Sequence, residues 1–168
     1  CKDMIEKIEN QTFTYSFIFR IIFRYGNIIV TPIIVLYSIP LYYFISEKPI
    51  LIFPIIVNLG IIFFLNRHYL NLYKILPYRI QADDVKIVCS NFFLSKKELT
   101  IYYTDISSLR GGIFDNKISG LMNVCDKSNN VCIGFYHRLN NSSKLATIIL
   151  SKVRRNIYDE VLEKIQSG

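Results

Sequence analysis

Two long runs of apolar residues dominate the first half of the chain. They cover residues 28–45 and 49–65, consist mainly of Ile, Leu, Val, Phe and Tyr, and contain no charged residue. A helix needs about 20 apolar residues, with about 17 as the lower limit, to cross the hydrocarbon core of a bilayer. Both runs reach that limit, and neither leaves a polar face for water. The pattern therefore predicts two membrane-spanning helices.

The tetrapeptide SEKP at residues 46–49 separates the two runs and carries their only nearby charges. Four residues suffice to join two antiparallel helices, and a proline suits the first turn of the helix that follows. We therefore expect a transmembrane helical hairpin over residues 27–66. The alternative is a buried hairpin in a soluble protein, but the rest of the chain is too short to enclose two helices that are apolar on every face. No small-residue cleavage site follows the runs, so we expect no cleavable signal peptide.

Asn58 and Gly60 lie near the middle of the second run and are candidates for helix packing. Residues of these types often mark the face where membrane helices meet. A single Asn can also be merely tolerated inside a span, and the sequence leaves both interpretations open.

Residues 12–25 combine apolar side chains with Arg20 and Arg24, which are one helical turn apart and so share a face. This pattern is typical of a helix in the membrane interface, with both guanidinium groups directed to lipid headgroups. A cytoplasmic extension of the first span is the alternative. Residues 1–10 have the pattern of a short polar amphipathic helix. We expect residues 1–26 to form one N-terminal amphipathic segment at the interface.

The cationic residues around the hairpin are distributed unequally. Only Lys48 lies in the turn, whereas five others flank the spans on the opposite side: Arg20, Arg24, Arg67, Lys74 and Arg79. The positive-inside rule therefore predicts that both termini are cytoplasmic. The net charge of +7 includes no dense basic run. This argues against nucleic-acid binding and fits attraction to anionic membrane lipids.

From residue 78 onward the chain consists of short β-like runs separated by turn residues. These runs cover residues 78–82, 85–90, 91–106, 121–126, 131–139 and 144–150, and the turn KSNN joins two of them into a predicted hairpin. Residues 155–165 place their apolar side chains on one helical face. We expect a cytoplasmic domain of six or seven strands and one C-terminal helix over residues 78–168, joined to the hairpin by a juxtamembrane linker over residues 67–77.

These motifs resemble the bacterial pleckstrin-homology-like (PH-like) domains of small membrane proteins. The matching segments are YRI at 78–80, VKIV at 85–88, Lys96 and Lys97, and IYYTDI at 101–106. The glycine usual in that family before the second strand is Asp84 here, which also favours a turn. The resemblance implies a mostly-β split barrel of seven strands with a C-terminal capping helix, in a protein of the bacterial inner membrane. The motifs are structural and imply no particular activity.

The sequence contains no convincing catalytic or metal-binding constellation. The four cysteines form no CxxC pair, and the gap between Cys125 and Cys132 differs from the usual spacing of zinc ligands. We expect Cys89 and Cys132 to be small buried strand residues, and all four cysteines to be unpaired, as in the cytoplasm. Turn aspartates such as Asp83 and Asp115 are interpreted as caps. We therefore expect no enzyme activity, no cofactor and no metal.

The expected function is that of an accessory or scaffold protein in a membrane complex. Its cytoplasmic PH-like domain would dock a partner membrane protein or a second copy of the chain. One alternative is a sensor of anionic lipid headgroups that uses Lys96, Lys97 and Arg110. Another is a small subunit of a transport complex, with Asn58 and the prolines of the spans along the pathway. The candidate contacts to headgroups or partners are Arg20, Arg24, Lys96, Lys97, Arg110, Arg154 and Arg155.

Overall fold

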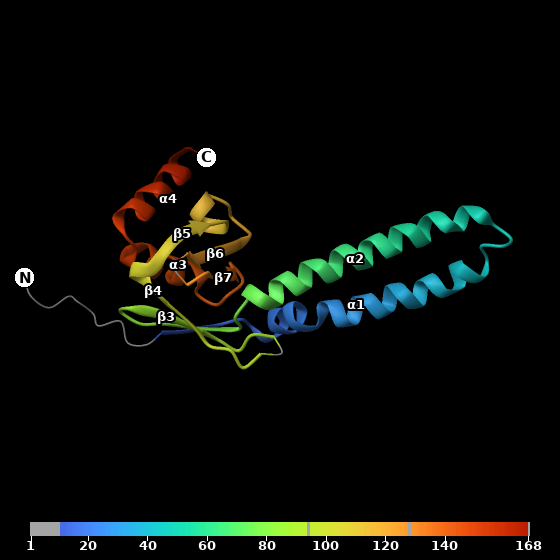
Figure 1. The fold of residues 1–168 in the computed structure, drawn as a ribbon, viewed down its shortest axis with the longest axis horizontal. Coiled ribbons are helices and arrows are strands. Elements are labelled where there is room, and N and C mark those ends of the chain that lie inside the picture. Colours follow the sequence, from blue (N-terminus) through green and yellow to red (C-terminus); the bar gives the residue numbers. More distant parts are fainter. Residues whose placement is uncertain (1–10, 94, 128, 168) are drawn as a thin grey trace, which may run out of the picture. The chain divides into compact units, whose positions relative to one another are not determined.

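The structure is a computed structural model that describes residues 11–93, 95–127 and 129–167 (Figure 1). It divides into two compact units. The first, which we call the hairpin unit, comprises Ile18–Lys74. The second, which we call the β unit, comprises the described residues before and after it. The amphipathic helix expected over residues 1–10 lies outside the described residues.

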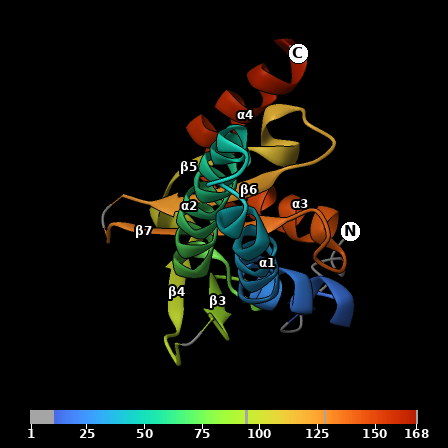
Figure 2. The ribbon, with the colours of Figure 1, turned by 90° about the vertical axis from the view of Figure 1, so that its right-hand side faces the viewer.

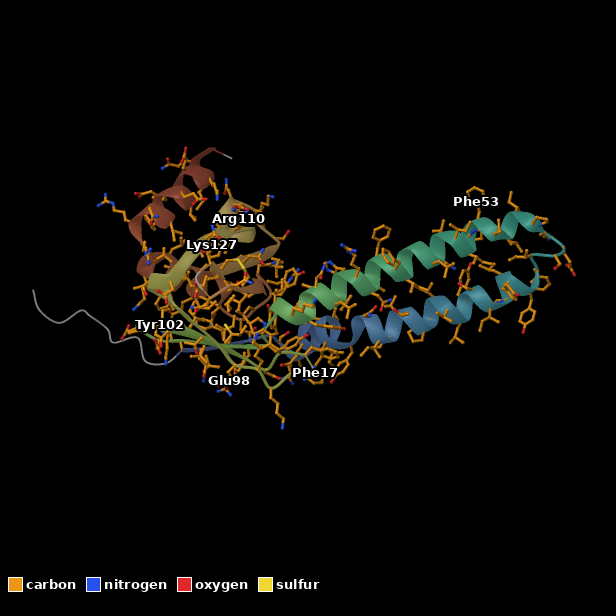
Figure 3. All side chains as sticks on the ribbon, in the orientation of Figure 1. Phe17, Phe53, Glu98, Tyr102, Arg110 and Lys127 are labelled. Atoms are coloured by element: carbon orange, nitrogen blue, oxygen red, sulfur yellow. A yellow bond between two sulfur atoms is a disulfide. The ribbon has the colours of Figure 1, made fainter. Side chains whose placement is uncertain are left out.

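Two long helices form the hairpin unit: α1 covers Phe17–Tyr43 and α2 covers Ile52–Ile75. They lie side by side in both Figure 1 and Figure 2. Both are long and apolar enough to cross a membrane, and no side chain in the most apolar window of either helix is buried. Phe53, for example, projects outward from α2 and is 72% exposed (Figure 3). The two predicted apolar helices are thus present, and each is longer than its apolar run.

The SEKP segment connects the two helices, as predicted. The Lys48 N–H donates to the Phe44 carbonyl (2.9 Å), which closes the turn after α1. Pro49 then begins a short 3₁₀ turn directly before α2. Proline is favourable there because the first N–H groups of a helix have no carbonyl partner within it. Pro32 and Pro40 lie inside α1, where proline is rare in water-soluble helices but tolerated in membrane helices.

The predicted N-terminal segment over residues 1–26 is divided between the two units. Its described part begins with strand β1, Gln11–Thr14, and α1 starts soon afterwards. β1 pairs antiparallel with β2, Arg79–Ala82, and buries Phe13 to 3% exposure. The prediction of a separate helix over residues 12–25 is therefore wrong: residues 12–14 belong to β1, and residues 17–25 continue α1, as the alternative of an extended first span predicts. Pairing with a strand from after the hairpin outweighs the local pattern, because strand formation depends on cross-strand packing.

Seven antiparallel strands form two sheets in the described part of the β unit. The first sheet has the order β1-β2-β3-β4, where β3 is Lys86–Ser90 and β4 is Leu99–Tyr102. The second has the order β5-β6-β7, where β5 is Ile106–Arg110, β6 is Leu121–Asp126 and β7 is Val131–Tyr136. The predicted hairpin of β6 and β7 is confirmed. Six strands follow the hairpin unit in the chain, and β1 adds the seventh.

Alternate side chains of both sheets are buried, as the two-residue period of a strand requires. Ile80, Ile87 and Ile101 of the first sheet and Ile133 of the second have no exposed surface. Val85, the first residue of the predicted run over residues 85–90, departs from this pattern: it precedes β3 and is 61% exposed.

Two helices follow the strands: α3, Ser142–Lys152, and α4, Arg155–Ser167. The predictions of a β-like run over residues 144–150 and of a single C-terminal helix are therefore wrong. Leu145, Ile148 and Ile149 of α3 are buried, which is the three- and four-residue spacing of one helical face. α4 packs on β5 and on the 3₁₀ turn that follows β5.

Chain connectivity inserts the hairpin unit between β1 and β2, two neighbouring strands of the first sheet. Tyr15 directly follows β1 and Tyr78 directly precedes β2, and their rings meet edge to face with centroids 6.2 Å apart. The Tyr15 hydroxyl accepts a hydrogen bond from the Tyr136 N–H at the end of β7 (2.9 Å), and Tyr15 forms a β-bridge with Leu139. Tyr15, between β1 and α1, therefore contacts residues next to or within both sheets.

Candidate functional site

A hydrogen bond joins the middle of the two hairpin helices. Asn58 Nδ2 of α2 donates to Ser38 Oγ of α1 (2.9 Å), and Ser38 donates in turn to the Ile34 carbonyl (2.8 Å). Asn58, which we singled out for helix packing, thus faces α1. Gly60 does not pack in this way, because a Cβ atom there would meet no atom within 4 Å.

A second polar cluster lies nearer the end of the hairpin that is remote from SEKP. Asn27 Nδ2 donates to Asn66 Oδ1 across the helices (2.8 Å), and Thr31 Oγ1 donates to Asn27 Oδ1 (2.9 Å). Asn66 Nδ2 donates to the Ile62 carbonyl (2.8 Å). Interhelical hydrogen bonds in membranes contribute about 0.6 kcal/mol each on average. We call these three residues, together with Ser38 and Asn58, the polar seam.

Asn58 is the only member of the polar seam that we predict from the sequence, although the sequence contains a signal for the others. Asn27 and Asn66 are nearly equidistant from the SEKP turn, and so are Ser38 and Asn58. In an antiparallel hairpin, residues equidistant from the turn lie opposite each other. Pairing the polar residues that are equally far from the turn on its two sides therefore predicts both clusters.

The end of the hairpin remote from SEKP carries most of its positive charge, and we call it the cationic end. The Tyr73 hydroxyl donates to the Arg24 carbonyl (3.1 Å), which places Arg24 of α1 beside the last turns of α2. Arg24 is half-buried, and Arg20 is exposed one turn before it. Arg67 and Lys74 are exposed on α2. The structure thus brings cations from both helices to one end.

The three cations predicted to form a headgroup site on the β unit are not gathered in one place. Lys96 and Lys97 are exposed in the segment before β4, and Arg110 is exposed at the end of β5. Figure 3 shows Glu98, which directly follows Lys97, and Arg110 on opposite sides of the β unit. A single lipid headgroup does not reach all three.

Arg154 and Arg155 lie where α3 ends and α4 begins, and both are exposed. The Arg155 guanidinium Nε lies 3.9 Å from an Asp159 carboxylate oxygen one turn later. An ion pair this exposed contributes little to stability, but Asp159 offsets the unfavourable position of a cation at a helix N-terminus. Leu150 and Tyr158 line a groove of about 660 Å³ between the two helices, together with Arg155.

Strand β4 forms an open edge of the first sheet. Within residues 11–93, 95–127 and 129–167, no strand pairs with its outer side. The Tyr103 N–H, just after β4, donates to the Val85 carbonyl on the β3 side (3.2 Å). Because backbone groups alternate in direction along a strand, the N–H and C=O groups of Thr100 and Tyr102 point to the open side. Both side chains are exposed, and Figure 3 shows Tyr102 at the periphery of the β unit.

Cys125 and Cys132 form a disulfide across the β6–β7 hairpin, with their Cα atoms 4.1 Å apart. The prediction that the cysteines are unpaired is wrong for these two, and Cys132 is exposed rather than buried. The strand register explains the pairing, because the two residues lie directly opposite each other. Cys89 is a buried free thiol, as predicted, and burial raises its pKa. Such a thiol is chemically inert at neutral pH.

Two turn aspartates act as caps, as predicted. Asp83 Oδ1 accepts a hydrogen bond from the Lys86 N–H in the β2–β3 turn (2.7 Å), and Asp115 Oδ2 accepts one from the Gly111 N–H after β5 (2.7 Å). Their carboxylate oxygens therefore accept hydrogen bonds from the backbone.

Across the described ranges of the chain, no three His, Cys, Asp or Glu side chains are grouped so that they would hold a metal ion.

An ion pair connects α3 to the β2–β3 turn. Lys152 Nζ lies 2.8 Å from Asp84 Oδ1 and also donates to the Asp84 carbonyl (3.1 Å). The same ammonium group lies 5.9 Å from the ring centroid of the buried Tyr103. These contacts link α3 to the first sheet.

No protein-family model, no curated protein and no solved structure matches this chain. Three features of the chain itself bear on its function: the polar seam, the cationic end and the open edge of β4.

Proposed function

We propose that the hairpin unit spans the inner membrane of a bacterium, with both of its ends on the cytoplasmic side. The unburied apolar side chains of α1 and α2 support the span, because they need a lipid environment. The cationic end supports the orientation. The disulfide argues against a cytoplasmic β unit, since disulfides are rare in that compartment. The strand register places Cys125 directly opposite Cys132, and the proposed orientation rests on the cationic end.

For the β unit we propose a PH-like split barrel. The division of seven strands into sheets of four and three, followed by helix, supports this proposal. Two features depart from the pattern implied by the resemblance. The first strand precedes the membrane hairpin, and two helices rather than one follow the last strand.

As its activity we propose non-enzymatic docking: the chain is an accessory or scaffold subunit that holds a partner protein, or a second copy of itself, at the membrane. The open edge of β4 is the observation that carries this proposal. An extended peptide can add to such an edge as a further strand, with backbone hydrogen bonds supplying affinity. The free groups of Thr100 and Tyr102 would form those bonds. β4 is only four residues long, and a short edge limits unspecific pairing with other proteins.

Substitution of Thr100 tests this proposal directly. Thr100→Pro removes an N–H group that points away from β3, so the existing sheet keeps its hydrogen bonds. Thr100→Val is the matched control, because it changes the side chain and keeps the backbone donor. Each variant of the chain is tagged, expressed at native level, extracted in mild detergent and analysed by mass spectrometry of co-purifying proteins. Circular dichroism confirms that both variants remain folded.

We expect a stoichiometric partner, or a dimer of the chain, in the wild type and in Thr100→Val, and its loss in Thr100→Pro. Equal retention in both variants would show that β4 is not the docking edge. A monomer with no protein partner in any sample would remove the proposal itself.

Neither alternative function has a supporting observation of its own. A headgroup sensor that uses Lys96, Lys97 and Arg110 together conflicts with their separation on the β unit. A transport pathway along Asn58 conflicts with the polar seam, in which Asn58 is bonded to Ser38 across the helices.

A further inference from the structure

A groove of about 580 Å³ follows one face of α2, entirely within the hairpin unit. We call it the α2 groove. Its lining residues recur every three or four positions and include Leu59, Ile62, Phe63, Arg67, Leu70 and Lys74. This spacing marks a single stripe of the helix. Its volume lies in the range of ligand-binding sites, about 300–1,000 Å³.

The α2 groove changes in character along its length. The part toward SEKP is lined by Leu59, Ile62 and Phe63, and the part toward the cationic end contains Arg67 and Lys74. At 1.5 Å per residue, the groove is about 22 Å long, with about 12 Å between Leu59 and Arg67. One leaflet of a bilayer, headgroups included, is about 20–22 Å thick. The α2 groove therefore has the length and the apolar-to-cationic order of one phospholipid.

The charges in the α2 groove favour an anionic occupant. Neither Arg67 nor Lys74 has an ion-pair partner in the part of the chain that the structure describes. The only acidic residue between positions 18 and 74 is Glu47, which lies in the SEKP turn at the other end of the hairpin. Asn71 lines the same stretch and provides an amide donor for phosphate or ester oxygens.

We infer that the α2 groove binds one anionic phospholipid of the cytoplasmic leaflet, with its phosphate between Arg67 and Lys74 and an acyl chain along Phe63, Ile62 and Leu59. This inference rests on the proposed membrane span. A membrane helix from a partner also fits an apolar stripe, but it does not neutralise two cations at the membrane surface. An anionic headgroup does so while its acyl chain covers the apolar part.

Native mass spectrometry of the full chain in mild detergent tests this inference. The chain is titrated with phosphatidylglycerol and, separately, with phosphatidylcholine of the same acyl chains. The groove variant is the double substitution Arg67→Gln and Lys74→Gln. Its matched control, Arg20→Gln and Lys48→Gln, removes the same charge from positions outside the groove. Circular dichroism of both variants checks that the helices remain intact.

We expect the wild type and the control to retain one phosphatidylglycerol in preference to phosphatidylcholine. In the groove variant the affinity for phosphatidylglycerol should fall by roughly fivefold for each lost cation. Equal retention of both lipids by the wild type would overturn the inference, because it indicates unspecific annular lipid. Equal loss in the control variant, displacement by inorganic phosphate, or a lipid-free dimer would also overturn it.

Alkaline carbonate extraction of membranes separates failure of this site from failure of the membrane span. A chain that stays in the membrane pellet but shows no lipid preference refutes the α2 groove alone. A chain released into the supernatant refutes the proposed span, and the site with it.

Discussion

Tyr15 provides a sharp test of how β1 is attached to the β unit. Its side chain is 3% exposed, and its hydroxyl accepts the hydrogen bond of the Tyr136 N–H at 2.9 Å. Tyr15→Phe keeps the ring and its packing against Tyr78 but removes this acceptor. This hydrogen bond is only partly buried, so the loss of its acceptor should cost about 1 kcal/mol, the lower end of the range for a buried N–H group. We therefore expect the free energy of unfolding of the β unit to fall by that amount.

Urea unfolding of the full chain in detergent micelles, followed by circular dichroism, measures this change. Tyr102→Phe is the control, because Tyr102 is 45% exposed on the open edge and its hydroxyl is free to bond with water. Substitutions at such surface positions change stability by no more than about 0.5 kcal/mol. If Tyr15→Phe is as mild as Tyr102→Phe, the hydroxyl does not fasten β1 to β7, and our account of the junction is incorrect.

The same residue predicts a dependence on alkaline pH. Burial raises the pKa of Tyr15 well above its usual value, which is about 10 in an unfolded chain. Above pH 10 the unfolded chain loses this phenolic proton while the folded chain keeps it, so stability falls as the pH rises. The decrease should approach about 1.4 kcal/mol per pH unit for this group. Tyr15→Phe should reduce the slope above pH 10 and leave the slope below pH 9 unchanged.

Further predictions concern the other contacts. Reduction of the Cys125–Cys132 disulfide should destabilise the β unit by about 2.5 kcal/mol at most, given the short loop that it closes, as measured by urea unfolding with and without dithiothreitol. Lys152→Met should lower stability by less than about 1 kcal/mol, and high salt should diminish the difference. Ser38→Ala should weaken the hairpin by about 0.6 kcal/mol, as measured by unfolding in mixed micelles. After reduction, a membrane-impermeant maleimide should label Cys132 in lysed cells but not in intact spheroplasts, and labelling in intact spheroplasts would reverse the proposed orientation.

The sequence was most informative where structure depends on neighbours in the chain. The two apolar runs, the SEKP turn and the β6–β7 hairpin around KSNN all follow from local patterns, and the structure contains each of them. Residues 144–150 misled us because Thr147, Ile148 and Ile149 suit a strand locally. In the structure the segment is helical, and the spacing of Leu145, Ile148 and Ile149 buries all three on one face of the helix. Burial of that face outweighs the weak intrinsic preference of β-branched residues.

Features that join distant parts of the chain were harder to predict. β1 pairs with a strand from beyond the hairpin, so nothing near residues 11–14 indicates its partner. The partners of Asn58 and Asn27 are also distant in the sequence, so they can be predicted only when the two helices are aligned antiparallel about their turn. The disulfide required the register of β6 and β7, because the number of residues between two cysteines does not determine whether they face each other. The open edge of β4 likewise depends on the order of strands in the sheet.

The insertion of the hairpin unit between β1 and β2 also determines the order of events during biosynthesis. The ribosome releases β1 first, but its partner strand emerges only after both apolar helices. Closing a flexible loop of about 60 residues costs about 3–4 kcal/mol of chain entropy. A hairpin that has already folded in lipid removes much of this cost, because its antiparallel helices bring β1 and β2 together. Under the proposed membrane span, a nascent chain that fails to insert pays this cost in full when β1 pairs with β2. Until β1 pairs, β2 is bonded to β3 on one side and has an open edge on the other.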